Sequence, residues 1–226
     1  KLNKDASLIS ELDKKLARMA YDYADRVVAV SNALAKRLKT NFSVDAEVIP
    51  DMFNLPKVEP VAKDDNVFRV VSVGRIVRGK GFFKLVNAFY QAQIPENSEL
   101  IIIGDGPLKE FIQEGLVNHR TRLVGLKSRE EIVRYLQSAD MFALLSQSET
   151  FGVSCIEALS VGLPVLVTRC GGPEDFINES NGMLVPVGDM EEAGVAISKM
   201  YLKKYDKEAI KKDCYEKYSP DAVARR

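Results

Sequence analysis

Six short runs of apolar residues, separated by amphipathic stretches, occupy most of the chain from Phe68 onward. In order they read FRVVSV, LIIIGDG, TRLVG, DMFALLS, PVLVT and MLVPV. Runs that are apolar on both faces are typical of strands in a parallel sheet that helices cover on both sides. The alternation therefore predicts an α/β domain built on a doubly wound, Rossmann-like parallel sheet.

Turn and helix patterns between these runs support the same interpretation. Ser128 and Glu131 form a capping-box pattern ahead of a helix that extends through Leu136. In GDGP, Pro107 is expected at the first position of a helix. Glycines follow three of the predicted strands, where the chain must turn: Gly74, Gly104 and Gly125.

The first 67 residues follow a different pattern. Apolar residues at helical spacing precede a VVAV strand, a short helix capped by Ser31 and a proline-containing linker. Because these few elements cannot enclose a core, we expect residues 1–49 to be the tail of an earlier Rossmann-like domain. The remaining units are predicted as an interdomain linker (50–66), a C-terminal Rossmann-like domain (67–204) and C-terminal helices (205–226).

The composition excludes several classes of function. The 32 basic and 32 acidic side chains cancel, so no net charge draws the chain to nucleic acid. A single histidine leaves no His pair for a metal ion and no good candidate for a Ser-His-Asp relay. Cys155, Cys170 and Cys214 show no CxxC spacing and lie in or beside apolar runs, so we expect buried, reduced thiols and a reducing compartment.

Two features bear on membranes. No uninterrupted apolar run approaches the 18 residues of a membrane-spanning helix. The lysine-rich segment from Glu191 to Tyr218 predicts helices with a solvated charged face, and contact with a membrane surface is the alternative.

The segment VVSVGRIVRGKG places three cations in a loop between a strand and a helix. The strand ends at Val73, and Arg75, Arg78 and Lys80 precede a helix that begins near Gly81. Helix N-termini carry free N–H groups and a positive dipole, so such a loop suits a diphosphate. A solvated basic turn is the alternative.

A second polar loop follows the strand MFALL and contains Glu149, and the next helix begins near Gly152 and carries Glu157. Both carboxylates are thus predicted near the carboxyl edge of the sheet, where open α/β folds bind ligands. The alternative is an ordinary loop acid and a solvated helix residue. The third segment, CGGPED, is predicted as a turn or as a further part of the same edge.

In order, GRIVRGKG, GDGP, SETFGVSCIE, GLPVLVT, CGGPED and NGMLVP resemble the C-terminal domain of the retaining glycosyltransferases of family four, the glycosyltransferase group 1 set with the GT-B fold. The family's Glu-x7-Glu signature corresponds to Glu149 and Glu157. ADRVVAVSNALAKRL and VIPDMFN look like the end of that family's N-terminal domain and its linker. The resemblance implies the C-terminal half of a GT-B enzyme, with residues 67–204 as the nucleotide-sugar-binding domain.

The resemblance also implies roles for single residues. Arg75 and Lys80 would bind the donor diphosphate and stabilise it as it leaves, and Glu149 would accept hydrogen bonds from the transferred sugar. Glu157 would hold the ribose hydroxyls, and backbone near Leu126 would meet the base. The full implied donor set is Gly74, Arg75, Lys80, Leu126, Glu149, Thr150, Phe151, Gly152 and Glu157, of which Arg75, Lys80 and Glu149 are implied as catalytic. CGGPED lacks a residue that many members have before Pro-Glu, so Glu174 is left out of this set.

The expected function is that of a retaining glycosyltransferase acting in surface polysaccharide or glycoconjugate synthesis. The donor would be a nucleotide-diphosphate sugar, a UDP-sugar or a GDP-sugar, and the acceptor a glycan, a lipid-linked acceptor or another hydroxyl. No metal, other cofactor or nucleic acid is expected, and the chain alone is expected to bind the donor without transferring sugar. We expect a cytoplasmic enzyme, with peripheral association of the full-length protein at the cytoplasmic membrane face as a further expectation.

Two other classes remain as alternatives. The first is a non-catalytic nucleotide-binding domain of the same fold. The second is a Rossmann oxidoreductase, which the sequence disfavours because no G-x-G-x-x-G follows a strand.

Overall fold

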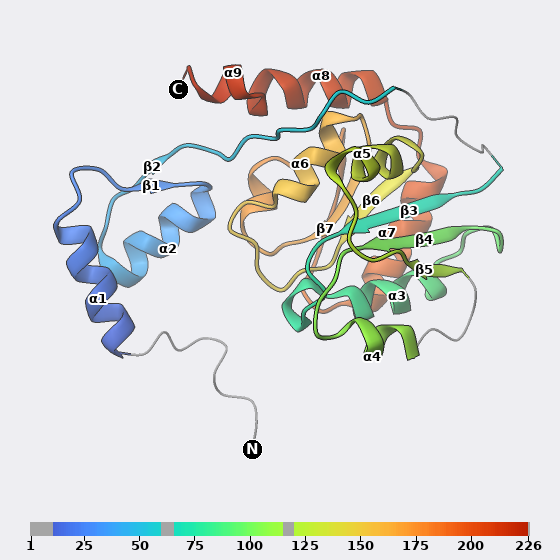
Figure 1. The fold of residues 1–226 in the computed structure, drawn as a ribbon, viewed down its shortest axis with the longest axis horizontal. Coiled ribbons are helices and arrows are strands. Elements are labelled where there is room, and N and C mark those ends of the chain that lie inside the picture. Colours follow the sequence, from blue (N-terminus) through green and yellow to red (C-terminus); the bar gives the residue numbers. More distant parts are fainter. Residues whose placement is uncertain (1–10, 60–65, 115–119, 226) are drawn as a thin grey trace.

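A computed structural model describes residues 11–59, 66–114 and 120–225. Figure 1 shows a large unit built around a central sheet and a smaller unit that contains α1 and α2. The large unit holds six parallel strands in the order β5-β4-β3-β6-β7-β8. The strands are β3 (Arg69–Val73), β4 (Glu99–Ile103), β5 (Thr121–Leu123), β6 (Met141–Leu144), β7 (Val165–Thr168) and β8 (Gly182–Val185).

This strand order confirms the predicted doubly wound sheet. The chain first builds outward from β3 to β5 and then returns to add β6 on the other side of β3. The order therefore reverses between β3 and β6, which pair in parallel. At such a switch point the loops that follow the two strands diverge and leave a crevice for a ligand.

Helices cover both faces of the sheet, as continuous apolar strands require. One face packs against α3 (Phe82–Gln91), α4 (Lys109–Glu114) and α7 (Met190–Leu202). The other packs against α5 (Arg129–Gln137), α6 (Val153–Ser160) and α8 (Lys207–Tyr218), which α9 (Pro220–Val223) follows. Alternate strand residues serve the two cores: Ile101 and Phe142 face α5 and α6, whereas Leu100 and Met141 face α3 and α7.

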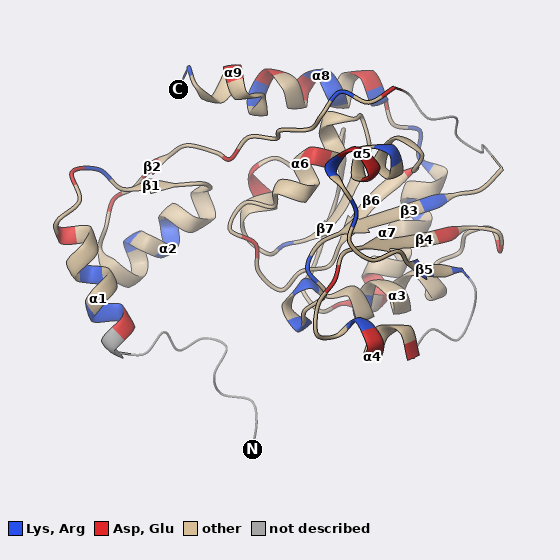
Figure 2. Cartoon of the chain, in the orientation of Figure 1, with Lys and Arg blue, Asp and Glu red and all other residues tan. Residues whose placement is uncertain are grey.

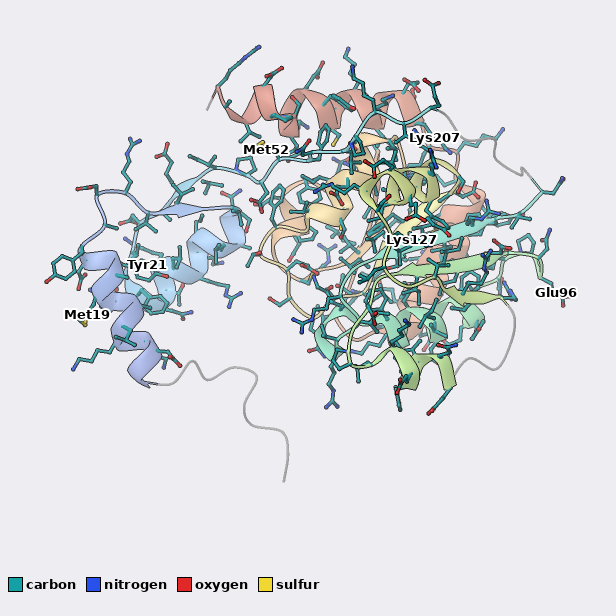
Figure 3. The ribbon with its side chains drawn as sticks, viewed as in Figure 1. Met19, Tyr21, Met52, Glu96, Lys127 and Lys207 are labelled. Carbon is teal, nitrogen blue, oxygen red and sulfur yellow. The ribbon has the colours of Figure 1, made fainter. Side chains whose placement is uncertain are left out.

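The smaller unit consists of α1 (Glu11–Asp22), β1 (Val28–Ala29), α2 (Asn32–Phe42) and β2 (Glu47–Val48). Its buried apolar residues within the described chain are Ala29, Leu38 and Phe42. Tyr21 points from α1 toward α2, where its ring meets Phe42 at a centroid distance of 5.2 Å, whereas Met19 is exposed (Figure 3). This core is small, and the division of the chain into domains stays a prediction.

The segment between the two units runs beneath α8 (Figure 1). Phe53 is buried there, its backbone N–H donates to the Tyr218 carbonyl at 3.2 Å, and its ring lies 4.8 Å from that of Tyr215. Figure 2 shows charges of both signs along α8, and its lysines are exposed, as the sequence predicted. Within the described residues, no helix combines the length and apolarity that a membrane crossing requires.

Local predictions were correct at most boundaries. The capping box of Ser128 and Glu131 is present at the start of α5. The prediction for Pro107 was wrong, because α4 begins at Lys109 and Pro107 lies in a turn that the Lys109 N–H closes onto the Gly106 carbonyl. The segment from Glu191 to Tyr218 is also interrupted, since α7 ends at Leu202 and α8 begins at Lys207.

Gly81 allows the loop after β3 to approach β6. It adopts a left-handed conformation with φ of 70° between the 3-10 turn η1 (Arg78–Lys80) and α3. A Cβ atom at this position would overlap the backbone carbonyl of Leu145, at the end of β6. Only glycine accepts both the dihedral angle and the close contact without strain. At Gly79, by contrast, an added Cβ would meet no described atom within 4 Å.

We predict that Gly81→Ala lowers the free energy of unfolding by about 1–3 kcal/mol, because it adds both dihedral strain and overlap with a backbone oxygen. Gly79→Ala in the same turn should change it by no more than about 0.5 kcal/mol. Urea denaturation of the two variants and the wild type measures both values. Equal effects of the two substitutions would contradict the proposed close approach.

Candidate functional site

The loops that follow β3 and β6 meet at the switch point of the sheet. The carbonyl of Gly79, in η1, accepts a hydrogen bond of 2.7 Å from the backbone N–H of Gln147. This bond ties the loop after β3 to the loop between β6 and α6. The sequence predicted both loops at the carboxyl edge, and the structure brings them into direct contact.

Lys80 and Glu149 form the centre of this contact. The Lys80 ammonium lies 2.7 Å and 3.0 Å from the two carboxylate oxygens of Glu149. The Ser146 hydroxyl donates to the same carboxylate at 2.6 Å. The Glu149 side chain is 10% exposed and that of Lys80 32%, so the pair is partly shielded from water. The carboxylate therefore accepts three hydrogen bonds, two from Lys80 and one from Ser146.

The backbone around Glu149 is fixed by the strand-like segment after β7. Its N–H donates to the Cys170 carbonyl at 2.9 Å, and its carbonyl accepts from the Gly172 N–H at 3.0 Å. Glu174 closes its own turn, since its carboxylate accepts from the Gly171 N–H at 3.0 Å. The Glu174 carboxylate is thus engaged within its own turn, and its omission from the predicted donor set stays a prediction.

Free backbone donors follow Glu149 directly. Within the described chain, the backbone N–H groups of Thr150, Phe151 and Gly152 donate no hydrogen bond. Gly152 precedes α6, whose first-turn N–H groups carry the positive end of the helix dipole. Acceptor oxygens, such as those of a phosphate or a sugar hydroxyl, would satisfy these groups.

Arg75 adds a cation that is not committed elsewhere. Its side chain is exposed in the loop after Gly74 and makes no hydrogen bond or ion pair with the part of the chain that the structure describes. The neighbouring Gly74 N–H donates to the Ile103 carbonyl at 3.0 Å, which anchors the start of this loop to β4. The loop after β3 therefore provides one engaged cation, Lys80, and two exposed cations, Arg75 and Arg78, whose side chains make no hydrogen bond or ion pair within the described part of the chain.

Glu157 lies on α6 and is paired with Arg129. The two side chains approach to 2.8 Å, and the Glu157 side chain is 13% exposed. Burial raises the pKa of the Glu157 carboxyl above its ordinary value, and the Arg129 guanidinium partly opposes that shift. Arg129 begins α5, shortly after the exposed Leu126, so this ion pair joins the loop after β5 to α6. Lys127, which follows Leu126, lies beside α5 in Figure 3.

Two residues that contact the predicted carboxylates were not predicted from the sequence. Ser146 is buried, follows β6 by two positions and lies three positions before Glu149. Arg129 follows the cap Ser128 and could have been placed at the start of a helix, but not opposite Glu157. The assignment of the predicted residues to a donor stays a prediction.

The cysteines have the predicted state. Cys155, Cys170 and Cys214 are buried and free. Burial raises the pKa of the Cys155 thiol well above its ordinary value, and the nearby Glu149 carboxylate acts in the same direction. These thiols therefore stay protonated and are poor nucleophiles. Among the described residues, no cluster of three or more His, Cys, Asp and Glu side chains is arranged to hold a metal ion.

The fold is a Rossmann-like domain on a doubly wound sheet, with Lys80 and Glu149 paired at the carboxyl edge of the sheet. The sequence model of the family described as glycosyl transferases group 1 matches residues 55–217. The chain therefore belongs to this family.

Known proteins support this membership. The chain is 29% identical over 192 residues to the lipopolysaccharide core biosynthesis glycosyltransferase LpsD of Rhizobium meliloti, covering 80% of this chain and 54% of that protein. The chain thus spans about half the length of that relative.

Solved structures share the fold. A sucrose-phosphate synthase of Thermosynechococcus elongatus superposes with a TM-score of 0.86 at 24% identity, over 99% of this chain and 62% of the other. HepE of Anabaena, solved in complex with UDP and glucose, superposes with a TM-score of 0.80 at 21% identity, over 96% of this chain and 65% of the other. The predicted fold, the C-terminal half of a GT-B glycosyltransferase, is confirmed.

The raised pKa of Glu157 predicts a pH-dependent stability. The folded state holds the Glu157 proton above pH 4.5, where the unfolded chain releases it, so stability is lost as pH rises through the raised folded pKa. The free energy of unfolding of the wild type should therefore fall relative to that of Glu157→Gln over this window. Urea denaturation of both proteins in steps between about pH 4 and pH 7 measures the difference.

Glu130 offers a matched control on α5 with the opposite sign. Hydrogen bonds from the helix backbone and the Ser128 hydroxyl lower the pKa of its carboxyl. Its stabilising contribution is present above the unfolded pKa and is lost as pH falls, so Glu130→Gln should lower stability at neutral pH more than at acid pH. A difference between the wild type and Glu157→Gln that is constant with pH would contradict the prediction.

Proposed function

We propose that this chain is the donor-binding part of a retaining glycosyltransferase that uses a nucleotide-diphosphate sugar. One observation carries the proposal: Lys80 and Glu149 are held together at the switch point, next to three free backbone N–H groups. A cation, a carboxylate and backbone donors are the groups needed to bind a diphosphate and the hydroxyls of a sugar at one edge.

The chemistry follows from the charge that develops during transfer. When the bond between sugar and phosphate breaks, negative charge collects on the diphosphate and positive charge on the sugar ring. Arg75 and Lys80 would stabilise the leaving diphosphate, an effect of about 3 kcal/mol for one well-placed donor. Glu149 would hold the sugar hydroxyls and Glu157 the ribose, with the base near Leu126.

Donor binding requires an exchange of partners. Lys80 donates to both carboxylate oxygens of Glu149. A diphosphate that takes Lys80 would release the carboxylate of Glu149 to accept hydrogen bonds from the sugar. Similarly, ribose hydroxyls would compete with Arg129 for Glu157. Glu149 thus lies beside Lys80 where the diphosphate would bind, and Arg129 lies beside Glu157 where the ribose would bind.

The related proteins narrow the proposed substrates. HepE was solved with UDP and glucose, which supports a UDP-sugar as the first donor to test and leaves a GDP-sugar as the second. LpsD acts in lipopolysaccharide core biosynthesis, which supports a glycan or lipid-linked acceptor. Because the chain spans about half of that relative, we propose that it binds the donor without transferring sugar. The free thiols support a cytoplasmic enzyme, and peripheral membrane association stays a prediction.

A titration with UDP, GDP, ADP and NAD, followed by calorimetry and repeated with a chelator, tests this proposal. We expect UDP or GDP to bind and the chelator to leave binding unchanged, because side-chain cations and backbone N–H groups hold the diphosphate. Binding of NAD alone would support the oxidoreductase alternative. Binding of UDP without any preference for a UDP-sugar would support a non-catalytic nucleotide-binding domain.

Substitutions of Glu149 and Glu157 should change the affinities for UDP and UDP-glucose differently. Glu149→Ala should weaken binding of UDP-glucose by about tenfold or more, because hydrogen bonds to a charged acceptor are each worth about 1.5–3 kcal/mol. It should leave UDP binding unchanged or slightly tighter, since Lys80 no longer has to leave a carboxylate. Glu157→Ala should weaken both ligands equally. Calorimetric titration of each variant with both ligands measures these ratios.

Glu174→Ala is the matched control. This exposed carboxylate lies after the neighbouring strand and is engaged in its own turn, so its removal should change neither affinity. Thermal unfolding of all three variants verifies that the fold is retained. Equal losses of UDP and UDP-glucose in a folded Glu149→Ala variant would rule out the assigned role of Glu149.

A further inference from the structure

The first turn of α2 lies against the loop that carries Glu149. Ser31, the N-cap of α2, is 1% exposed, and its hydroxyl donates to the Thr150 carbonyl at 2.6 Å. The same hydroxyl accepts a hydrogen bond of 3.1 Å from the Leu34 N–H. Ser31 therefore joins two segments that lie 119 positions apart in the chain.

A second contact fixes the other side of this loop. The Asn32 backbone N–H donates to the Asp175 carboxylate at 2.7 Å, so the positive end of α2 faces an anion. Asp175 belongs to the 3-10 turn η2 (Gly172–Asp175), whose Gly172 N–H holds the Glu149 carbonyl. Two consecutive residues at the start of α2 thus contact both strand-end loops that frame Glu149.

The hydrogen bond from Ser31 fixes the orientation of the peptide unit between Thr150 and Phe151. Among the described groups, the Ser31 hydroxyl is the donor that engages the Thr150 carbonyl. A peptide unit is planar and trans, so its carbonyl and its N–H point in opposite directions. Fixing the Thr150 carbonyl therefore also fixes the direction of the Phe151 N–H, one of the free donors beside Glu149.

We propose that Ser31 is a positioning residue for the sugar-binding part of the donor site, supported by the contact between Asn32 and Asp175. It acts through the Thr150–Phe151 peptide and does not touch the donor. This inference rests on the proposed function, because it assigns the Phe151 N–H to the sugar. The competing explanation is that the hydroxyl only caps α2.

The test is calorimetric titration of Ser31→Ala with UDP and with UDP-glucose. We expect the affinity for UDP-glucose to fall about three- to tenfold, the size of one neutral hydrogen bond, and the affinity for UDP to change less than about twofold. Ser31→Thr, which keeps a hydroxyl donor and acceptor, should restore UDP-glucose binding. Loss of a cap alone would lower the melting temperature without this selectivity.

Two further variants keep the test decisive. Ser219→Ala removes an equivalent N-cap, the bond from the Ala222 N–H at the start of α9, and should change neither affinity. Asp175→Ala removes the partner of the Asn32 N–H and changes only an exposed side chain. It should show the same selective loss of affinity for UDP-glucose. This variant therefore tests the proposal even if Ser31→Ala does not fold.

The outcomes separate the two proposals. If the wild-type chain binds none of UDP, UDP-glucose and GDP, the proposed function fails. If the wild type binds both UDP and UDP-glucose, but the Ser31 and Asp175 variants lose both ligands equally or lose neither, only the positioning role is overturned. Selective loss of UDP-glucose in Ser31→Ala and its recovery in Ser31→Thr supports it.

Discussion

The ion pair between Lys80 and Glu149 is the interaction on which the candidate site depends. It requires that β3 and β6 be neighbours, that Gly81 admit the close approach to Leu145, and that the loop after β6 be held by Cys170 and Gly172. Withdrawing a carboxylate from water is costly unless a cation and hydrogen bonds compensate for it. Lys80 and the Ser146 hydroxyl supply that compensation, so the candidate site is organised around its two charges.

The same ion pair links the two halves of the proposed donor. A diphosphate would compete with Glu149 for Lys80, and sugar hydroxyls would compete with Lys80 for Glu149. Under the proposed function, a nucleoside diphosphate that draws Lys80 away would free the carboxylate for the sugar, whereas a free sugar would meet a carboxylate that already accepts from Lys80. The intact nucleotide-sugar would be favoured over either of its parts, because it would offer new partners to both side chains.

The sequence predicted the strands of the sheet but not which side chains pair with each other. Apolar runs predicted all six strands, because burial on both faces leaves a pattern within each run, and the capping box is local to Ser128 and Glu131. The bond between Ser31 and Thr150 spans 119 positions, and no local pattern specifies such a contact. The prediction for Pro107 was wrong for a local reason. Pro107 lies in a turn before α4, and proline is favoured in turns as well as at the first position of a helix.

The smaller unit contacts the large unit through directional bonds at the start of α2. Its own buried core within the described chain is three residues, and Leu16 and Met19 on α1 are more than 40% exposed. Apolar contacts are non-directional and fix the angle between two packed units only loosely. Hydrogen bonds are directional, and those of Ser31 and Asn32 end on the loops that frame Glu149. The hydrogen bonds of Ser31 and Asn32 therefore couple the first turn of α2 to the loops around Glu149, so a change in the position of one is expected to shift the other.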